Sequence, residues 1–111
     1  MVWVTALAPL LLAGAYAPPN EWVIAPGPTG NQFMDVCGAN WQPGFYDGCG
    51  SFILGIVDTL AAERIVCLPP GIEIKQVQAI GYEAIRSKPD QWQKAAHYLI
   101  SRHFKEKYPC R

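Results

Sequence analysis

Four cysteines limit what this chain of 111 residues can fold into. Cys37, Cys49, Cys67 and Cys110 fall where the helices predicted below begin or end. An even number of cysteines in a short exported chain is typical of a disulfide framework. Redox and metal sites prefer two cysteines only a few residues apart, as in C-x-x-C, and the closest spacing here runs from Cys37 to Cys49. We therefore expect the cysteines to be structural.

Four cysteines allow three pairings, and we predict Cys37–Cys49 and Cys67–Cys110. The first bridge joins two helices that are adjacent in sequence across a short turn. The second ties the end of the second helix to the chain terminus, which would otherwise fray. A domain of this size buries little surface, so its stability depends on such bridges.

Residues 1–17 are predicted to be an export signal. An apolar run over residues 2–13 is followed by Gly14-Ala15-Tyr16-Ala17, small residues in the A-x-A pattern of a cleavage site. The run is about 12 residues long, whereas a bilayer crossing needs roughly 20. We expect cleavage after Ala17 and a soluble exported product. Because no Lys or Arg precedes the run, an uncleaved anchor and a misassigned start codon are the alternatives.

The composition of the remaining chain divides it into a leader and one domain. Residues 18–30 are rich in Pro and Gly and are expected to form an irregular leader, which Trp22, Val23 and Ile24 can dock on the domain. Residues 31–111 form the domain. Nine Lys and Arg balance nine Asp and Glu, which argues against nucleic acid or an anionic membrane as a partner of the mature protein.

The domain is predicted to be all-α, with four helices stapled by the two disulfides. Apolar residues recur at intervals of three and four along each predicted helix, and no strand-like alternation competes. The first helix covers residues 31–39 and the second residues 45–65. The third covers residues 74–85 and stops before Pro89. The last begins after Asp90 and extends through residues 92–104.

The sequence also predicts the N-caps of the first and last helices and a strip of small residues on the second. Thr29 or Asn31 is the predicted N-cap of the first helix, and Asp90 that of the last. The second helix also has a strip of small residues, which lowers its helix propensity but lets another backbone approach, from within the domain or from a second subunit. The strip consists of Gly48, Ser51 and Gly55.

The polar side chains offer little catalytic chemistry. His97 and His103 are six positions apart and point roughly 240° around a helix from one another, so they cannot chelate one metal ion. Ser101 is close to His103 in sequence but faces elsewhere. Asp58 is interpreted as a helix-packing hydrogen-bond partner rather than a catalytic base. We expect no metal, no cofactor and no enzyme activity.

Four landmarks carry a resemblance to a known family. Residues 49–58 correspond to its second-helix motif C-x-G-Y-I-x-G-V-x-D, with Ser51 and Phe52 in place of the motif Gly and Tyr. Residues 67–73 correspond to its C-L-P-x-G-V-T turn, with Glu73 in place of the Thr. Residues 87–90 correspond to an H-P-E-like turn and residues 108–110 to a terminal F-P-C. With these landmarks the chain resembles the Rap/Tai family of type VI secretion immunity proteins over roughly residues 31–111.

The resemblance implies a function that needs no chemistry from the chain itself. Proteins of that family are small, exported and helical, and they neutralise cell-wall amidase toxins in the periplasm. Members of that family commonly pair through helices, and half of the residues in this chain are hydrophobic. Together these features predict a homodimer. The alternatives are a periplasmic acid-stress chaperone or another small binding protein of the same scaffold, and a small secreted hydrolase. The few, interspersed acids count against the chaperone, and the lack of a nucleophile–base pair counts against the hydrolase.

For an amidase inhibitor, the expected toxin contact is the turn between the third and fourth helices. Pro89 fixes the local backbone, so this turn would lose little entropy on entering a cleft. Trp92 is expected to anchor the turn to the domain. The alternative is a solvated turn in which Asp90 only caps the next helix. The predicted toxin-binding residues are Ser87, Lys88, Pro89, Asp90 and Gln91.

Overall fold

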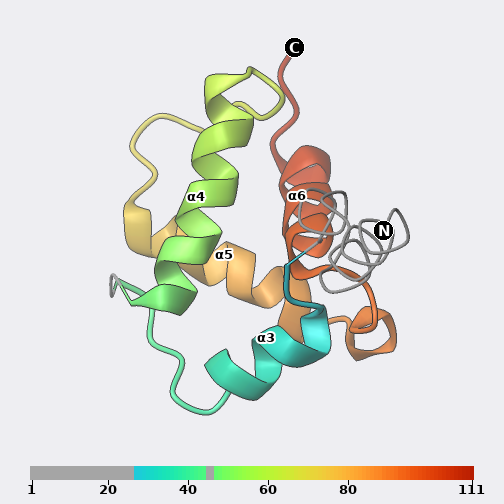
Figure 1. Ribbon diagram of the computed structural model, residues 1–111. Coiled ribbons are helices and arrows are strands. Elements are labelled where there is room, and N and C mark those ends of the chain that lie inside the picture. The colour runs from blue at the N-terminus through green and yellow to red at the C-terminus, as the bar shows by residue number, and fades with distance from the viewer. Residues whose placement is uncertain (1–26, 45–46) are drawn as a thin grey trace, which may run out of the picture.

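The computed structural model describes residues 27–44 and 47–111, so the predicted signal peptide and most of the predicted leader lie outside the described residues. Within these ranges the chain forms four α-helices, one 3-10 turn and no β-strand, which confirms the all-α prediction. None of these helices is both long and apolar enough to cross a membrane. The elements are α3 (Gly30–Cys37), α4 (Gly48–Ala62), α5 (Ile74–Arg86), η1 (Pro89–Gln91) and α6 (Ala96–Lys107) (Figure 1).

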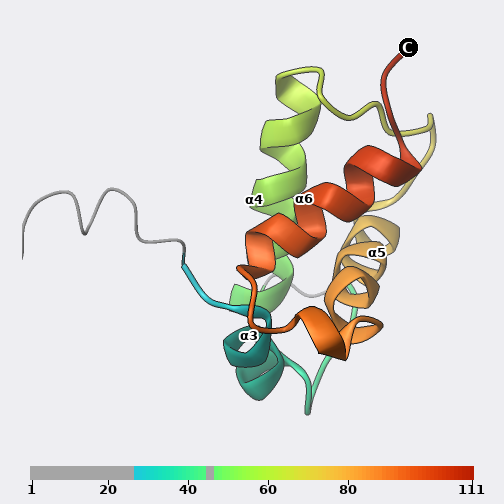
Figure 2. The same ribbon diagram turned by 90° about the vertical axis from the view of Figure 1, so that its right-hand side faces the viewer.

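Three helices make the body of the domain, and the fourth closes one end. Each of α4, α5 and α6 packs against the other two. Helices α4 and α6 run in the same sense, with α5 crossing behind them (Figure 1). The short helix α3 lies beneath, near the start of α4, and packs against α5 and α6 (Figure 2).

The core consists of apolar side chains that recur at helical spacing on each of the four helices. These side chains lie on one face of each helix, so packing the faces against one another buries all of them. Four large apolar side chains that are completely buried join α4, α5 and α6 at the centre: Ile53, Ile85, Ile100 and Phe104. Further core residues from the four helices are Phe33, Val57, Val77, Ala84, Ala96 and Leu99.

Helix α5 has a glycine at a tight contact with α4. A Cβ added at Gly81 would collide with the Cγ2 methyl group of the fully buried Ile53. Gly81 is therefore required by packing, and its cost in helix propensity is offset by the closer approach of the two helices.

Polar side chains cap the first two helices. The Thr29 hydroxyl accepts a hydrogen bond from the Gln32 amide at 3.1 Å, and the Gln32 side chain accepts one from the Thr29 amide at 2.9 Å. This reciprocal capping box identifies Thr29, not Asn31, as the N-cap of α3. The Asp47 carboxylate caps α4 by accepting from the Gly50 amide at 2.8 Å.

The predicted start of the last helix is wrong. Asp90 lies inside η1 rather than at an N-cap, and α6 begins only at Ala96. The intervening backbone makes long-range hydrogen bonds instead: Gly30 donates to the Lys94 carbonyl, and Asn31 to the Trp92 carbonyl, both at 2.8 Å. These pairings hold residues 92–95 out of the helix that local pattern favours.

The second helix is shorter than the predicted residues 45–65. It ends at Ala62, and Arg64 then adopts a left-handed conformation with φ of 60°. The next amides, those of Ile65 and Val66, donate back to the Leu60 carbonyl at 2.9 and 3.2 Å, which closes the helix.

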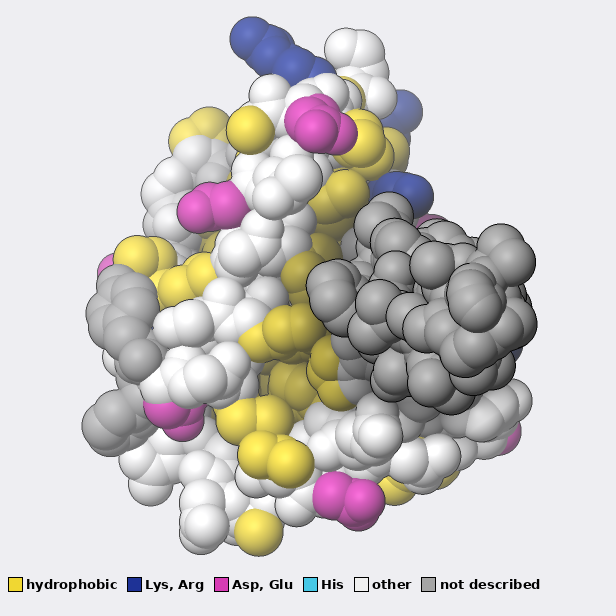
Figure 3. All heavy atoms as spheres, viewed as in Figure 1, with side chains coloured by type: hydrophobic (Ala, Val, Ile, Leu, Met, Phe, Trp, Pro, Cys, Tyr) yellow, Lys and Arg dark blue, Asp and Glu magenta, His cyan; other side chains and the backbone are white. Residues whose placement is uncertain are grey.

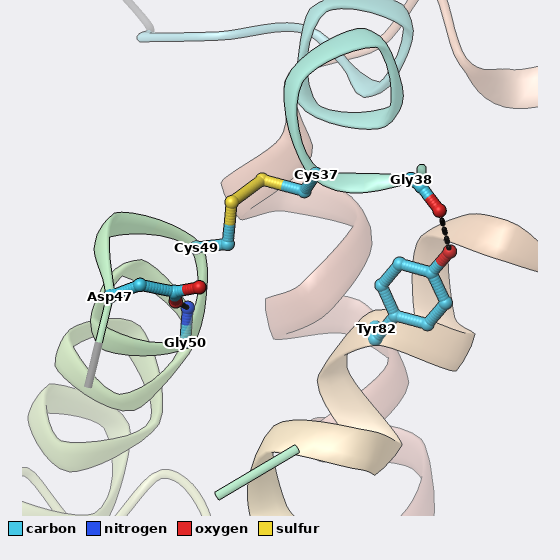
Figure 4. The surroundings of a disulfide bond; sticks show 6 residues. All are labelled: Cys37, Gly38, Asp47, Cys49, Gly50 and Tyr82. Carbon is cyan, nitrogen blue, oxygen red and sulfur yellow. Dashed lines mark hydrogen bonds between the residues drawn. A yellow bond between two sulfur atoms is a disulfide. The ribbon is translucent and has the colours of Figure 1, made fainter. Parts of the chain in front are cut away.

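Both predicted disulfides are present. Cys37–Cys49 joins the end of α3 to the first turn of α4, with 5.9 Å between the Cα atoms (Figure 4). Cys67–Cys110 joins the segment after α4 to the chain end, with 4.8 Å between the Cα atoms. The Cys67 amide also donates to the Tyr108 carbonyl at 2.9 Å, so this second junction is held by backbone as well.

Two contacts with the Tyr82 side chain fasten the connection between α3 and α4 to α5. The Tyr82 hydroxyl donates to the Gly38 carbonyl at 3.4 Å (Figure 4). Trp41 stacks on the Tyr82 ring with 4.4 Å between the ring centroids. Trp41 thus covers one side of the core.

The contact at Gly81 predicts a stability difference between two glycines. Gly81→Ala should lower the free energy of unfolding by roughly 1–2 kcal/mol, because overpacking against Ile53 exceeds the gain in helix propensity. Gly55→Ala is the matched control: it meets open space and should raise stability by up to about 1 kcal/mol. Urea unfolding followed by circular dichroism measures both, and equal effects of the two substitutions would contradict this packing.

The two disulfides should differ in their contribution. Loop-closure entropy predicts that removing Cys67–Cys110 costs about 4 kcal/mol and removing Cys37–Cys49 about 3, because the spans are 43 and 12 residues. Paired Cys→Ala variants, compared by urea unfolding under non-reducing conditions, test this order. A larger loss from the shorter loop would show that local packing, and not loop length, sets the contribution.

Candidate functional site

The turn between α5 and α6 has a defined backbone. In η1 the Gln91 amide donates to the Lys88 carbonyl at 2.9 Å, and the Trp92 amide donates to the Pro89 carbonyl at 3.3 Å. On the preceding side, the Ser87 hydroxyl donates to the Glu83 carbonyl at 2.7 Å. Of the predicted toxin-binding residues, Pro89, Asp90 and Gln91 form the 3-10 turn, and Ser87 and Lys88 connect it to the end of α5.

Trp92 anchors this turn, as predicted. Its ring packs against the core, and its indole N–H donates to the Ile85 carbonyl at 2.6 Å. Ser87, Pro89 and Asp90 are exposed at the tip. Because the turn is fixed from below and exposed above, a partner that contacts the tip meets a preorganised surface.

Charged groups on α5 and α6 flank the turn. The Arg86 guanidinium binds the Glu83 carboxylate in a two-pronged contact, which lowers the pKa of Glu83 and raises that of Arg86. Burial of the imidazole, followed by the nearby positive charge of Lys88, lowers the pKa of His103. His103 is half-buried, and because its pKa is lowered it is an uncharged side chain beside the turn at neutral pH.

A second surface feature is an open apolar groove between α4 and α6 (Figure 3). His97 and Ser101 form the α6 wall. The α4 side is formed by small and apolar residues, namely Ser51, Phe52, Gly55, Ile56, Thr59 and Leu60. The groove adjoins a second hollow between α3 and the start of α4, with Phe52 common to both.

The strip of small residues lies exposed on this face. No atom lies within 4 Å of a Cβ added at Gly48 or Gly55, and Ser51 is exposed as well. The strip therefore makes no close helix–helix contact within the described part of the domain. The prediction that it lets another helix of the same domain approach is wrong, and a contact with a second subunit stays a prediction.

The remaining polar residues fall in separate places. His97 is exposed and shares the groove with Ser101, four positions along the helix, whereas His103 lies by the turn. Asp58 is exposed, so its interpretation as a helix-packing group is wrong. Among residues 27–44 and 47–111, no three His, Cys, Asp or Glu side chains are grouped so as to hold a metal ion.

One structural residue was missed at the sequence level. Gln78 is completely buried, and its side-chain oxygen accepts a hydrogen bond from the Gly44 amide at 2.5 Å. Its position four residues after Ile74 and three before Gly81 places it on the apolar stripe of α5, a signal that could have identified it.

A protein-family model matches most of the chain. The family model described as Rap1a immunity proteins matches residues 29–110, which is well over half of the chain. No curated protein and no solved structure gives a significant match.

The environment of His103 predicts a pH dependence of stability. Since its pKa is lower in the folded state, the unfolded chain binds the proton more readily, and stability falls as pH decreases below the ordinary value of about 6.5. His103→Gln should therefore lose less stability than the wild type between about pH 7.5 and 5. Urea unfolding across this range tests it, with His97→Gln as the matched control. Parallel curves for wild type and His103→Gln would contradict the prediction.

Proposed function

The chain belongs to the family of Rap1a immunity proteins, and from this premise we propose that it binds and inhibits a peptidoglycan amidase delivered by type VI secretion. An immunity protein protects its cell by binding a toxin, and the described residues suit binding more than catalysis. The histidines lie apart, and all four cysteines are held in disulfides.

We place the protection in the periplasm. The predicted signal over residues 1–17 supports export, and two disulfides suit an oxidising compartment. An amidase that cuts peptidoglycan acts in the same compartment. Toxin and inhibitor would then meet where both are folded.

The observation that carries the proposed mode of action is the ordered turn of residues 87–91. It presents Pro89 and Asp90 outward on a backbone fixed by the Trp92 anchor. A turn that is already ordered loses little conformational entropy when it enters a cleft, so more of the contact energy appears as affinity. We propose that this turn covers the active site of the amidase, with Lys88 and Gln91 at the rim.

Substitutions in the turn should separate inhibition from folding. Lys88→Glu should weaken binding of an amidase encoded beside this chain roughly tenfold or more, because it reverses a charge at the rim of the contact. Lys75→Glu makes the same charge change at the opposite end of α5 and is the matched control. Thermal unfolding checks that both variants are folded, and inhibition of peptidoglycan cleavage is the readout.

Two further variants complete this test. Asp90→Ala should change stability by no more than about 0.5 kcal/mol, because Asp90 does not cap an α-helix. A chain with both Lys88→Glu and Gln91→Ala that still inhibits fully would place the toxin contact elsewhere.

We also propose that the protein acts as a homodimer. The exposed strip of Gly48, Ser51 and Gly55 supports this, since it makes no close contact within the described domain and has room for a second helix. Multi-angle light scattering at tens of micromolar should give the mass of two chains.

A further inference from the structure

A hollow with mostly apolar walls, the α3–α4 hollow, lies between α3 and the start of α4. Val36 lines it from α3 and Phe52 from α4. Val36 is 78% exposed, more than any other large hydrophobic residue in the described part of the chain. A Cβ added at Gly48, also in the lining, would meet no atom of the described residues within 4 Å, so the hollow has room for further side chains. Exposed apolar surface of this kind is typical of a contact surface.

The predicted leader joins the domain at the edge of this hollow. Pro28 is one of the lining residues, and its carbonyl accepts a hydrogen bond from the Ala96 amide at 2.9 Å, which fixes Pro28 at the start of α6. Residues 27–29 lead from beside α6 into α3 (Figure 2). The residues that precede Pro28 are therefore tethered beside the hollow, and this tether gives them a high effective concentration there.

The apolar part of the leader is close enough in sequence to reach the hollow. This leader tract, Trp22-Val23-Ile24, lies outside the described residues. Its last residue precedes Pro28 by four positions and its first by six, which at about 3.3 Å per residue allows separations of up to roughly 13 and 20 Å. Gly27, between the tract and the domain, has a positive φ of 76°, which glycine adopts without strain. A bend at Gly27 lets the leader fold back over α3.

The leader tract and the hollow match in chemistry. The tract consists of three large apolar residues, and the only charged residue between positions 18 and 26 is Glu21, which precedes the tract. Among the described residues that line the hollow, Asp47 alone is charged, and its carboxylate already accepts a hydrogen bond from the Gly50 amide. Docking the tract would therefore bury apolar surface without burying an unpaired charge.

We infer that the leader tract docks in the α3–α4 hollow of its own chain and covers Val36. The docked tract lies over the junction of the two helices, where Cys37 and Cys49 also line the hollow. Ser51 and Gly55, which support the proposed homodimer, line the neighbouring groove and not this hollow. The inference goes beyond the proposed function and does not depend on the toxin or on a second copy of the chain.

Nuclear Overhauser spectroscopy locates the leader tract directly. In the disulfide-intact chain that starts at Pro18, the predicted product of export, side chains of the tract should give cross-peaks to the methyl groups of Val36. Cross-peaks to Ile56 in the neighbouring groove, or to no residue of the domain, would overturn the inference. A mixture of isotope-labelled and unlabelled chains separates contacts within one chain from contacts between chains. Cross-peaks that arise only between chains would also overturn it.

A comparison of variants tests the same contact through stability. Val36→Glu should lower the Tm of the chain by roughly 4–8 °C, because a carboxylate in the hollow prevents docking of the tract. In a leader variant with Trp22→Ser, Val23→Ser and Ile24→Ser, the same substitution should leave Tm nearly unchanged, since Val36 is then a solvent-exposed residue. Ile74→Glu is the matched control: Ile74 is also exposed but does not line the hollow, so its effect should be the same with either leader.

The outcomes separate this inference from the proposed function. A leader variant that has a lower Tm but still inhibits the amidase and keeps its oligomeric state supports docking of the leader. Equal effects of Val36→Glu with either leader would overturn the inference and leave the immunity function in place. If Val36→Glu keeps its Tm but fails to inhibit, the hollow belongs to the toxin. If it keeps its Tm but changes the oligomeric state, the hollow belongs to a second copy. Either of these last results overturns the inference.

Discussion

The junction at Cys67–Cys110 is the constraint on which the rest of the domain depends. It closes a span of 43 residues that contains α5, η1 and α6. The Cys67 amide bonds the Tyr108 carbonyl beside it, so the end of α6 is fixed to the segment that follows α4. A domain this small gains little from its core alone, and cross-linking removes much of the freedom of its unfolded chain. With α4 and α6 held together, the position of the groove is defined, and so is the stretch of chain that carries the turn.

Local sequence patterns predicted this architecture well because its determinants are local. Helical periodicity located four helices, and the cysteines that border the first two were paired correctly because a short turn separates them. The start of the last helix was wrong for the opposite reason. Its residues bond to Gly30 and Asn31, more than sixty positions earlier, and no local signal reports such a pairing. The toxin-binding turn stays a prediction, although its anchoring by Trp92 was confirmed.

The two surfaces of the domain suit different partners. The turn is polar, narrow and fixed from beneath, which fits insertion into an enzyme cleft. The groove between α4 and α6 is open and mostly apolar, and none of its lining residues in the described part of the chain is Lys, Arg, Asp or Glu, which fits an apolar partner surface. The turn lies between α5 and α6 and outside the groove lining, so the two surfaces are separate. His103 supports the turn from α6 as a neutral side chain at physiological pH, because burial and Lys88 disfavour its protonation.

The central claim is that this immunity protein acts through its ordered turn. The most direct measurement is amide hydrogen exchange of the disulfide-intact chain, alone and with the amidase encoded beside it. The amides of Gln91 and Trp92, which already bond within the turn, should exchange more slowly when the toxin is bound, and so should those of Ser87, Lys88 and Asp90. Slower exchange confined to α4 and α6, with the turn unchanged, would contradict the account.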